Sequence, residues 1–238
     1  MEKLPLFFHA NGGPGIIVQL DEANARHVVQ VLRMGAGEQI QLTNGNGLLW
    51  TGKIVATGKH KCEVQIDGEE GAGKPIARRT AIAISPVKNN SRFEWFLEKA
   101  TEIGISEIYP ILCHRTERAH FRHDRLLQIC ISAMLQSRQV WLPILHEPLS
   151  FAQFLRDAGK AYHHRWIAHC EPYEKHLLPK VLQPGMPDSV LLIGPEGDFT
   201  QGEIFEATNA GYQPVSLGNT RLRTETAGVV GAAFLCQD

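Results

Sequence analysis

The sequence predicts an α/β protein of two domains, in which a small N-terminal β-barrel precedes a larger domain of alternating strands and helices. Its 238 residues fit one large domain or two modest ones. Short strand-like segments fill the first 68 residues, and strand and helix signals alternate from Thr80 onward. The polar stretch Glu69–Pro75, with its glycines and proline, separates the two patterns, so we expect domains at residues 1–73 and 74–238.

The expected N-terminal domain consists of short segments rich in β-branched residues, separated by glycine and asparagine turns. One helix is expected from Asp21 through Leu32, because Asp21 can cap it and the apolar residues that follow have helical spacing. Several short strands with one helix are typical of a small barrel. The strands are expected at Gly15–Leu20, Glu38–Leu42, Leu48–Val55 and Cys62–Ile66.

The expected C-terminal domain is a mostly parallel sheet covered by helices, because its strands and helices alternate. Three Ser or Thr residues precede a Glu or Gln by three positions, which is the spacing of a capping box: Ser91, Ser150 and Thr200. Asp124 can cap a further helix through Ser137, and a last helix fills Thr226–Leu235. The strands are expected at Thr80–Ile84, Glu107–Leu112, Trp166–Ala168, Val190–Ile193 and Val215–Leu217.

Composition excludes several classes of protein. Hydrophobic residues make up 43% of the chain and charged residues 21%, which is ordinary for a globular protein and argues against disorder. No apolar run approaches the roughly 20 residues of a membrane span, and we see no signal peptide. Five scattered cysteines without a CxxC pair suggest a reduced, intracellular protein, so the expected location is cytoplasmic.

The net charge of −1 is unevenly distributed along the chain. Residues 74–138 hold 11 Lys and Arg against 6 Asp and Glu, whereas the segments on either side are acidic. A basic block in a neutral chain can bind a polyanion such as RNA. On charge alone, a solvated helical surface is the commoner explanation.

Two polar loops are expected at the carboxyl ends of buried strands, where ligands bind in parallel α/β sheets. The first is Ile193–Phe199, in which two glycines allow close backbone approach and Glu196 adds a carboxylate. The second is Leu217–Ala227, which contains two arginines, one carboxylate and three threonine hydroxyls. A helix cap requires one or two such groups, so this density favours a functional site. Neither GxxxxGK[ST] nor GxGxxG is present, which disfavours a nucleotide-using α/β enzyme.

Together these loops resemble the RsmE family of 16S ribosomal RNA uracil-N3 methyltransferases, within the SPOUT superfamily. The block that carries the resemblance reads IGPEGDFTQGEI and then LGNTRLRTETA. Arg26–Gly37 is similar to the family's H-x-x-x-V-L-R-x-x-x-G signature, and Glu98–Ile105 to its Q/E-K-A-T-E-L-G-V helix end. Gln136-Ser137 falls where the family has E-Q-S/C, so the resemblance covers nearly the whole chain.

The resemblance implies a PUA-like RNA-binding barrel followed by a SPOUT α/β domain with a deep trefoil knot. It implies methylation of the N3 position of a uridine in 16S ribosomal RNA of the small subunit, with S-adenosyl-L-methionine as cofactor. It also implies a homodimer through the C-terminal domain, for which the small residues of the last helix would be suitable. Close packing within one subunit would explain those residues equally well.

Candidate residues follow from the resemblance for the cofactor, from side-chain chemistry for catalysis, and from the barrel and the basic block for RNA binding. The catalytic candidates are Arg223, Glu225 and Glu196. The residues expected to bind S-adenosyl-L-methionine are His169, Cys170, Ile193, Gly194, Pro195, Glu196, Gly197, Leu217, Gly218, Asn219, Leu222, Arg223, Thr224 and Thr226. The residues expected to bind RNA are His27, Arg33, Lys88, Arg92, Lys99, Arg115 and Arg138. No metal is expected, since His114, His120 and His123 are interpreted as exposed loop histidines.

The chain departs from the family pattern at three places. Asp198 follows GPEG where the family usually has glycine, and an ion pair between Asp198 and Arg221 is one hypothesis for it. Thr220 and Arg221 replace an arginine and an aliphatic residue, so either Arg221 or Arg223 could contact the substrate. The family's S-E-R-[ST] appears as Cys113–Thr116.

Two alternatives remain at this stage. One is a SPOUT methyltransferase that acts on a different RNA nucleotide. The other is a non-catalytic RNA-binding protein of ribosome assembly that has kept the fold. The carboxylate–arginine cluster of Leu217–Ala227 argues against the second, because a binding module would not require it.

Overall fold

The computed structural model describes residues 4–70, 79–117, 121–183 and 185–237. The chain forms two compact units: residues 1–75 together with 134–142, and residues 76–133 together with 143–238. The boundary expected between residues 73 and 74 lies outside the described residues. No helix of the described ranges is long and apolar enough to cross a membrane.

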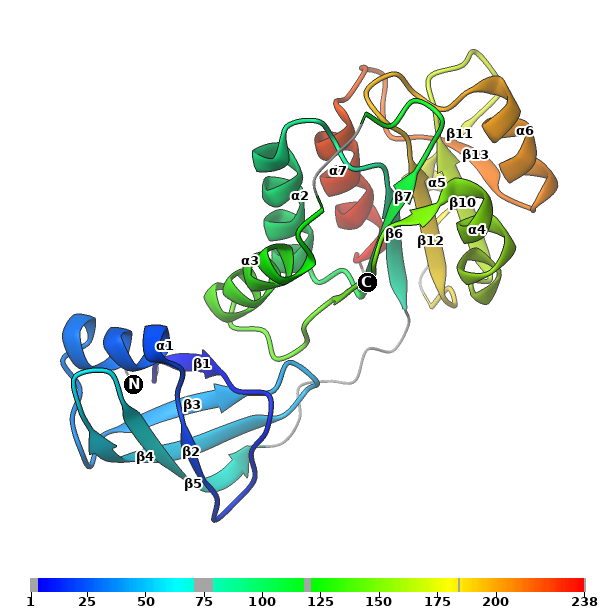
Figure 1. Ribbon diagram of the computed structural model, residues 1–238. Coiled ribbons are helices and arrows are strands. Elements are labelled where there is room, and N and C mark those ends of the chain that lie inside the picture. Colours follow the sequence, from blue (N-terminus) through cyan, green and yellow to red (C-terminus); the bar gives the residue numbers. More distant parts are fainter. Residues whose placement is uncertain (1–3, 71–78, 118–120, 184, 238) are drawn as a thin grey trace. The chain divides into compact units, whose positions relative to one another are not determined.

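The N-terminal unit is built on a small curled sheet of five strands in the order β1-β3-β4-β5-β2 (Figure 1). The four predicted strands are confirmed, and a fifth, β1, was missed because only three residues form it and only Phe7 among them is buried. Trp50, Ile40 and Ile66 are fully buried in the core of this sheet. The strands are β1 Leu6–Phe8, β2 Ile17–Gln19, β3 Gln39–Thr43, β4 Leu49–Thr57 and β5 Cys62–Glu70.

The predicted N-terminal helix is present but changes type along its length. Helix α1, Glu22–Arg26, is capped by Asp21, whose carboxylate accepts from the Asn24 backbone N–H at 2.8 Å, which confirms the predicted cap. It continues as a π-helix, η1 His27–Val31. The apolar spacing in the sequence does not distinguish an α-helix from a π-helix, because a π-turn has only one more residue in each hydrogen-bonded turn.

The Asn44–Gly47 turn of this unit packs against residues 134–142. Gly47 N–H donates to the Val140 carbonyl at 2.8 Å, and Leu142 N–H donates to the Gly45 carbonyl at 2.7 Å. A Cβ at Gly47 would lie 2.3 Å from Cζ2 of Trp141. Glycine is therefore required by this close approach as well as by the positive φ of 88° at Gly47.

The C-terminal unit is a parallel sheet in the order β11-β13-β10-β12-β6-β7-β8, with β9 paired to β7. All pairings in this sheet are parallel, which confirms the predicted α/β class. The central strands β6 and β12 are buried along their whole length, as strands covered on both faces must be. The strands are β6 Thr80–Ile84, β7 Glu107–Leu112, β8 Ile144–Leu145, β9 Leu149–Ser150, β10 His164–Ala168, β11 His176–Leu177, β12 Ser189–Ile193 and β13 Gln213–Ser216.

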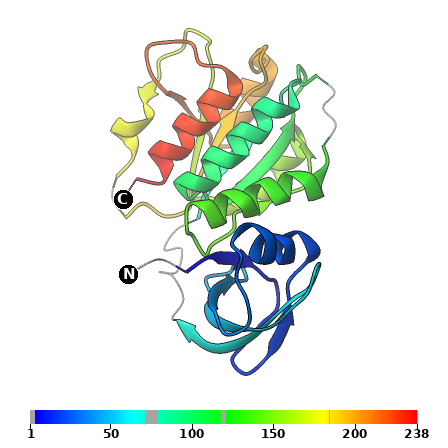
Figure 2. The same cartoon turned by 90° about the vertical axis from the view of Figure 1, so that its left-hand side faces the viewer.

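Helices cover both faces of this sheet, with α2 and α7 on one face and α4 and α6 on the other (Figure 1). Figure 2 shows α2 and α7 side by side. Side chains alternate along β6: Ala81 and Ala83 belong to the core under α4 and α6, whereas Ile82 and Ile84 face α7. The helices are α2 Asn90–Ile103, α3 His123–Gln136, α4 Phe151–Arg156, α5 Leu178–Val181, α6 Gln201–Asn209 and α7 Thr224–Leu235, with the 3-10 helix η2 at Ala158–Ala161.

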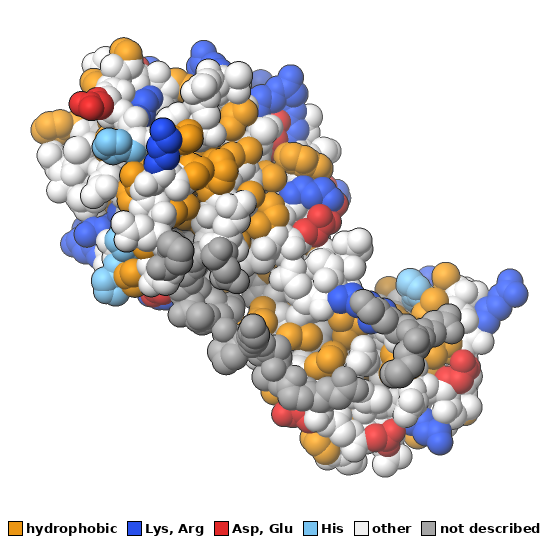
Figure 3. Space-filling model, turned by 180° about the vertical axis from the view of Figure 1, so that it is seen from behind, with side chains coloured by type: hydrophobic (Ala, Val, Ile, Leu, Met, Phe, Trp, Pro, Cys, Tyr) orange, Lys and Arg blue, Asp and Glu red, His pale blue; other side chains and the backbone are white. Residues whose placement is uncertain are grey.

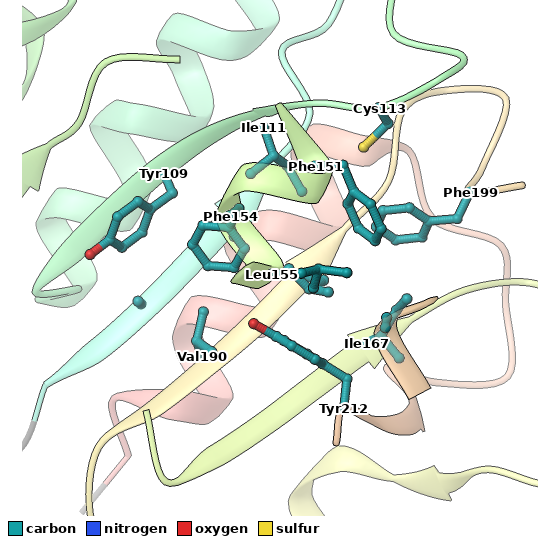
Figure 4. Packing of buried hydrophobic residues seen from close by; sticks show 14 of the residues in the cluster. Tyr109, Ile111, Cys113, Phe151, Phe154, Leu155, Ile167, Val190, Phe199 and Tyr212 are labelled. Atoms are coloured by element: carbon teal, nitrogen blue, oxygen red, sulfur yellow. The ribbon is translucent and has the colours of Figure 1, made fainter. Parts of the chain in front are cut away.

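The core under α4 and α6 is rich in aromatic side chains (Figure 4). Phe151 and Phe154 of α4 point toward the sheet, where Phe151 lies 5.5 Å from Phe199 and Phe154 lies 5.1 Å from Tyr109 between ring centroids. Phe199 thereby anchors the loop that follows β12. The rigid packing beneath this loop suits a site built on its other side.

The helix starts were predicted with mixed success. The capping boxes at Ser150–Gln153 and Thr200–Glu203 are both confirmed. The box at Ser91 is wrong, because Asn89 caps α2 and its side chain accepts from the Ser91 N–H at 3.0 Å. Asp124 lies inside the first turn of α3 rather than at its cap.

The last helix begins two residues earlier than expected. Its first residue is Thr224 and its N-cap position is Arg223, which makes no side-chain cap hydrogen bond. From β13 the chain returns to α7, which packs on the central strands β6 and β12. The deep trefoil knot expected at this crossing stays a prediction.

Candidate functional site

A cavity of about 700 Å³ lies beyond the carboxyl ends of β10, β12 and β13 in the C-terminal unit. Three loops build it: the one after β10, the one after β12, and the one that joins β13 to α7. Parallel strands end at the same edge of a sheet, so these loops converge although they are far apart in sequence. Its lining is Ala168, His169, Cys170, Lys175, Ile193, Gly194, Pro195, Glu196, Asp198, Val215, Ser216, Leu217, Gly218, Asn219, Thr220, Arg221, Leu222, Arg223, Thr224 and Ala227.

The loop after β12 is held from two sides. The Thr224 hydroxyl at the start of α7 donates to the Gly194 carbonyl at 3.0 Å, and this side chain is buried. Arg115 donates through Nη1 to the Gly197 carbonyl at 2.6 Å. A Cβ at Gly194 would lie 3.1 Å from the Phe199 ring, so glycine lets the loop turn tightly over that side chain.

The loop after β10 contains a buried histidine. His169 is 7% exposed, and neither of its ring nitrogens has a hydrogen-bond partner among the described residues. Burial, with the nearby Lys175 ammonium, lowers the pKa of His169 to about 4. The imidazole is therefore neutral at physiological pH.

Most of the residues predicted to bind the cofactor line this one cavity. Two do not: Gly197, which lies against Arg115, and Thr226 in the first turn of α7. Sequence reasoning missed Ala168, Lys175, Asp198, Val215, Ser216, Thr220, Arg221 and Ala227. Most of these adjoin the predicted loops, so extending each predicted loop by a few residues would have included them. For Lys175 no local signal exists.

The three catalytic candidates separate into two groups. Glu196 and Arg223 line the cavity and are exposed. Glu225 is buried and lies outside the cavity lining, with its Oε1 3.8 Å from Nε of Arg92 on α2 and its Oε2 without a hydrogen-bond partner among the described residues. Glu196 and Arg223 therefore lie on the same cavity, whereas the Glu225 side chain lies toward α2.

The residues predicted to bind RNA lie in both units. His27, Arg33 and Arg138 belong to the N-terminal unit, and Arg138 donates to the Leu4 carbonyl at 3.0 Å. The other four, Lys88, Arg92, Lys99 and Arg115, belong to the C-terminal unit. There Lys88 pairs with Glu117 at 2.9 Å, and Lys99 pairs with Glu98 and Glu102. Several of these charges are already partnered inside the protein.

Metal ligands do not converge in the part of the chain that the structure describes: no three His, Cys, Asp or Glu side chains there could hold an ion. His114 and His123 are described, whereas His120 lies outside the described residues.

With these features in place, comparison with known proteins shows that the chain belongs to the RNA methyltransferase family. A family model described as an RNA methyltransferase domain matches residues 74–235, and one described as an RNA methyltransferase PUA domain matches residues 20–67. Within that family the similar curated proteins carry the name "Ribosomal RNA small subunit methyltransferase E", which confirms the resemblance to RsmE. One from Synechocystis sp. is 29% identical over 219 residues, covering 91% of this chain and 71% of the relative.

Solved structures agree. A "probable rRNA-methyltransferase" from Porphyromonas gingivalis has a TM-score of 0.87 at 37% identity, covering 96% of this chain and 95% of that one. A Ribosomal RNA small subunit methyltransferase E from Neisseria gonorrhoeae, bound to S-adenosyl methionine, has a TM-score of 0.85 at 28% identity, covering 97% and 95%. The fold is therefore that of PUA-like and SPOUT methyltransferase domains.

Proposed function

We propose that this protein uses S-adenosyl-L-methionine to methylate N3 of a specific uridine in 16S ribosomal RNA of the small subunit. The observation that carries the proposal is the cavity at the carboxyl edge of the sheet, where three loops of an RNA methyltransferase domain place Glu196, Arg221 and Arg223 around one space. The bound S-adenosyl methionine in the Neisseria gonorrhoeae relative supports the cofactor.

The cavity fits such a cofactor. Its volume of about 700 Å³ lies within the range of small-molecule sites, and its lining combines apolar side chains with a few polar groups. The residues that would hold the cofactor are those of the three loops, with Gly194 and Gly218 allowing close approach of the backbone. When bound, S-adenosyl-L-methionine supplies a methyl group activated by the adjacent sulfonium.

The protein's own side chains must then prepare the uracil. N3 of uracil is nucleophilic mainly once its proton is lost, and the negative charge spreads onto the ring oxygens. Arg223 at the cavity edge stabilises that anion or holds a phosphate, because its guanidinium offers a planar fork of donors. Glu196, exposed on the cavity wall, accepts the N3 proton, for which a general base typically contributes about 10²–10⁴-fold.

Glu225 has a different role in this proposal. Because it lies outside the cavity lining and faces Arg92, it orients that arginine rather than taking the substrate proton. Arg221 also lines the cavity and is the alternative to Arg223 as the group that contacts the substrate.

RNA would be bound by the PUA-like unit and by the basic block of residues 74–138. The target uracil must be unstacked to reach the cavity, which suits a single-stranded or junction site. We further propose that the protein acts in the cytoplasm, on 16S RNA within the small ribosomal subunit.

A homodimer through the C-terminal unit is also proposed. Val229, Val230 and Phe234 of α7 are only partly buried in the single chain. Seen from behind, hydrophobic side chains gather in the middle of the C-terminal unit (Figure 3). A second copy could cover such a surface. Sedimentation equilibrium of the purified protein tests this, and a monomer at micromolar concentration would contradict it.

The decisive experiment is methyl transfer from labelled S-adenosyl-L-methionine to 30S subunits and to naked 16S RNA from a strain lacking this activity, followed by nucleoside analysis. We expect 3-methyluridine. A different methylated nucleoside would indicate a SPOUT enzyme with another target. Failure to bind the cofactor would indicate a non-catalytic RNA-binding protein.

Arg223→Ala tests the assignment of the substrate residue. Transfer should be nearly abolished while cofactor affinity stays close to that of the wild type, since the anion loses its partner. Arg221→Ala is the matched variant. If it abolishes transfer and Arg223→Ala does not, the two roles are exchanged.

A further inference from the structure

Asp198 has an unusual backbone conformation at the wall of the cavity. Its φ is 62°, in the left-handed region that favours glycine and costs free energy for other residues. Asp198 lines the cavity and follows directly after the glycine of the turn. The contacts of the Asp198 side chain offset this cost.

The Asp198 carboxylate joins two cavity loops. One oxygen accepts from the backbone N–H of Cys170, in the loop after β10, at 2.7 Å. The other accepts from the N–H of Phe199, in its own loop, at 2.8 Å. Phe199 is 1% exposed and packed in the core, so the carboxylate fastens the Cys170 backbone to a fixed point. Hydrogen bonds to a carboxylate are stronger than those between neutral groups.

The loop after β10 requires such a restraint. His169 is buried with both ring nitrogens unpartnered among the described residues, which disfavours the conformation observed. Lys175 lies further along the same loop, and its ammonium reaches back to donate to the carbonyls of His169 at 2.7 Å and Glu171 at 2.8 Å. Asp198 and Lys175 therefore both hold the segment His169–Glu171 at the start of this loop.

An ion pair between Asp198 and Arg221 does not account for this side chain. The described ion pairs do not include one between these two residues, and both carboxylate oxygens are already engaged with backbone N–H groups. The role of Asp198 is directed toward the Cys170 loop.

We propose that Asp198 is a positioning residue that latches the His169–Lys175 loop in the conformation that accepts the cofactor. It affects cofactor binding only by positioning that loop. This inference rests on the proposed cofactor site and adds a residue to it. Without the latch the loop samples other conformations, and ligand binding must then supply the free energy that orders it, which weakens affinity.

Asp198→Gly tests the latch. Glycine adopts a φ of 62° without strain, so the variant should fold, and its Tm should change little because relief of the strained backbone offsets the lost hydrogen bonds. We expect the Kd for S-adenosyl-L-methionine, measured by calorimetry on the full chain, to rise about 10-fold or more. KM for the cofactor should rise in parallel, while kcat at saturating cofactor stays near the wild-type value.

Two further variants separate the latch from general stability. Asp198→Asn tolerates the left-handed conformation and keeps one acceptor oxygen, so its Kd should fall between those of the wild type and the glycine variant. Asp21→Gly, in the N-terminal unit, likewise removes a carboxylate that accepts from a backbone N–H, that of Asn24 at 2.8 Å, and should leave cofactor affinity unchanged.

The Kd and Tm of Asp198→Gly distinguish a failure of this inference from a failure of the proposed function. A Kd for Asp198→Gly within about twofold of the wild type overturns the latch, whatever happens to Tm. A lower Tm with unchanged Kd assigns the residue a purely structural role and also overturns it. If the wild-type protein itself binds no S-adenosyl-L-methionine, the proposed cofactor site fails instead.

Discussion

At the residue scale, Glu107 shows how this fold keeps a charge in its interior. Glu107 begins β7 and is 5% exposed. Its Oε2 accepts from Tyr109 Oη at 2.7 Å and from His146 Nε2 at 2.9 Å, and Tyr162 donates in turn to Tyr109 at 3.3 Å. This polar cluster lies at the start of the strand, away from the carboxyl edge that carries the cavity.

The same cluster sets a pH dependence of stability. Burial acts to raise the pKa of Glu107, but the hydrogen bonds from His146 and Tyr109 outweigh it, so the pKa lies below the ordinary value. A depressed carboxyl pKa stabilises the folded state above the unfolded pKa, and this contribution is lost as pH falls through the folded pKa. Stability should therefore decline below about pH 4.5.

Glu107→Gln checks this account. At neutral pH the substitution should cost about 3 kcal/mol, because it breaks a buried network around a charge. The variant should also lose less stability than the wild type between pH 5 and pH 3. Urea unfolding at pH 7, 5 and 3 measures both effects, and equal acid sensitivity of the two proteins would contradict the assignment.

Thr224 offers a second test at this scale. Its buried hydroxyl donates to the Gly194 carbonyl, so Thr224→Val should destabilise the protein by about 1–2 kcal/mol and weaken cofactor binding. The control is Thr208→Val on α6, where the hydroxyl donates to the Ile204 carbonyl of the same helix at an exposed position. Calorimetry should show weaker binding in the first variant only, and equal affinities would contradict the role of Thr224.

At the scale of elements, the contact of α7 with α2 and β6 depends on small residues. A Cβ at Gly228 would lie 2.6 Å from the Phe96 ring of α2 and 2.8 Å from Ile84 of β6. Gly228→Ala should therefore destabilise the protein by about 1–3 kcal/mol, since the packed neighbours must move. Thermal unfolding measures the change.

Gly202 of α6 provides the matched control for that substitution. A Cβ there meets only the Thr200 hydroxyl at 3.9 Å, so Gly202→Ala should stabilise the protein by about 0.4–1 kcal/mol through the unfolded state. A Gly228→Ala variant that gains stability to the same extent would show that the helix contact is looser than the structure indicates.

At the scale of the whole molecule, charge distribution governs the encounter with RNA. The basic block of residues 74–138 carries a net +5 in a chain of net −1. If it contacts phosphates, the logarithm of RNA affinity should fall linearly with the logarithm of salt concentration, with a slope near −0.7 for each phosphate neutralised on single strands. Cofactor affinity should change little over the same range. A flat RNA response would remove the block from the interface.

The predictions that held depended on local rules. The Thr200–Glu203 capping box follows from residues three positions apart, and the buried strands Thr80–Ile84 and Glu107–Leu112 follow from continuous apolar runs. The polar loops that line the cavity were likewise predicted from their density of glycine, threonine and charge. Asn89 displaced Ser91 as the cap of α2, because neighbouring Asn and Ser residues compete for the same role.

The sequence alone was sufficient for the α/β class, the longer strands and helices, the family and the two main cavity loops, because each depends on short-range patterns. The short elements β1, β8, β9, β11 and α5 were not predicted, since two to four residues carry no clear periodicity. Tertiary structure alone determined that Asp198 binds the Cys170 loop, that Arg115 holds Gly197 and that Glu225 faces Arg92. These partners are separated by 28 residues in the first contact and 82 in the second. Such contacts form only where the parallel strands bring their carboxyl ends, and the loops that follow them, to one edge of the sheet.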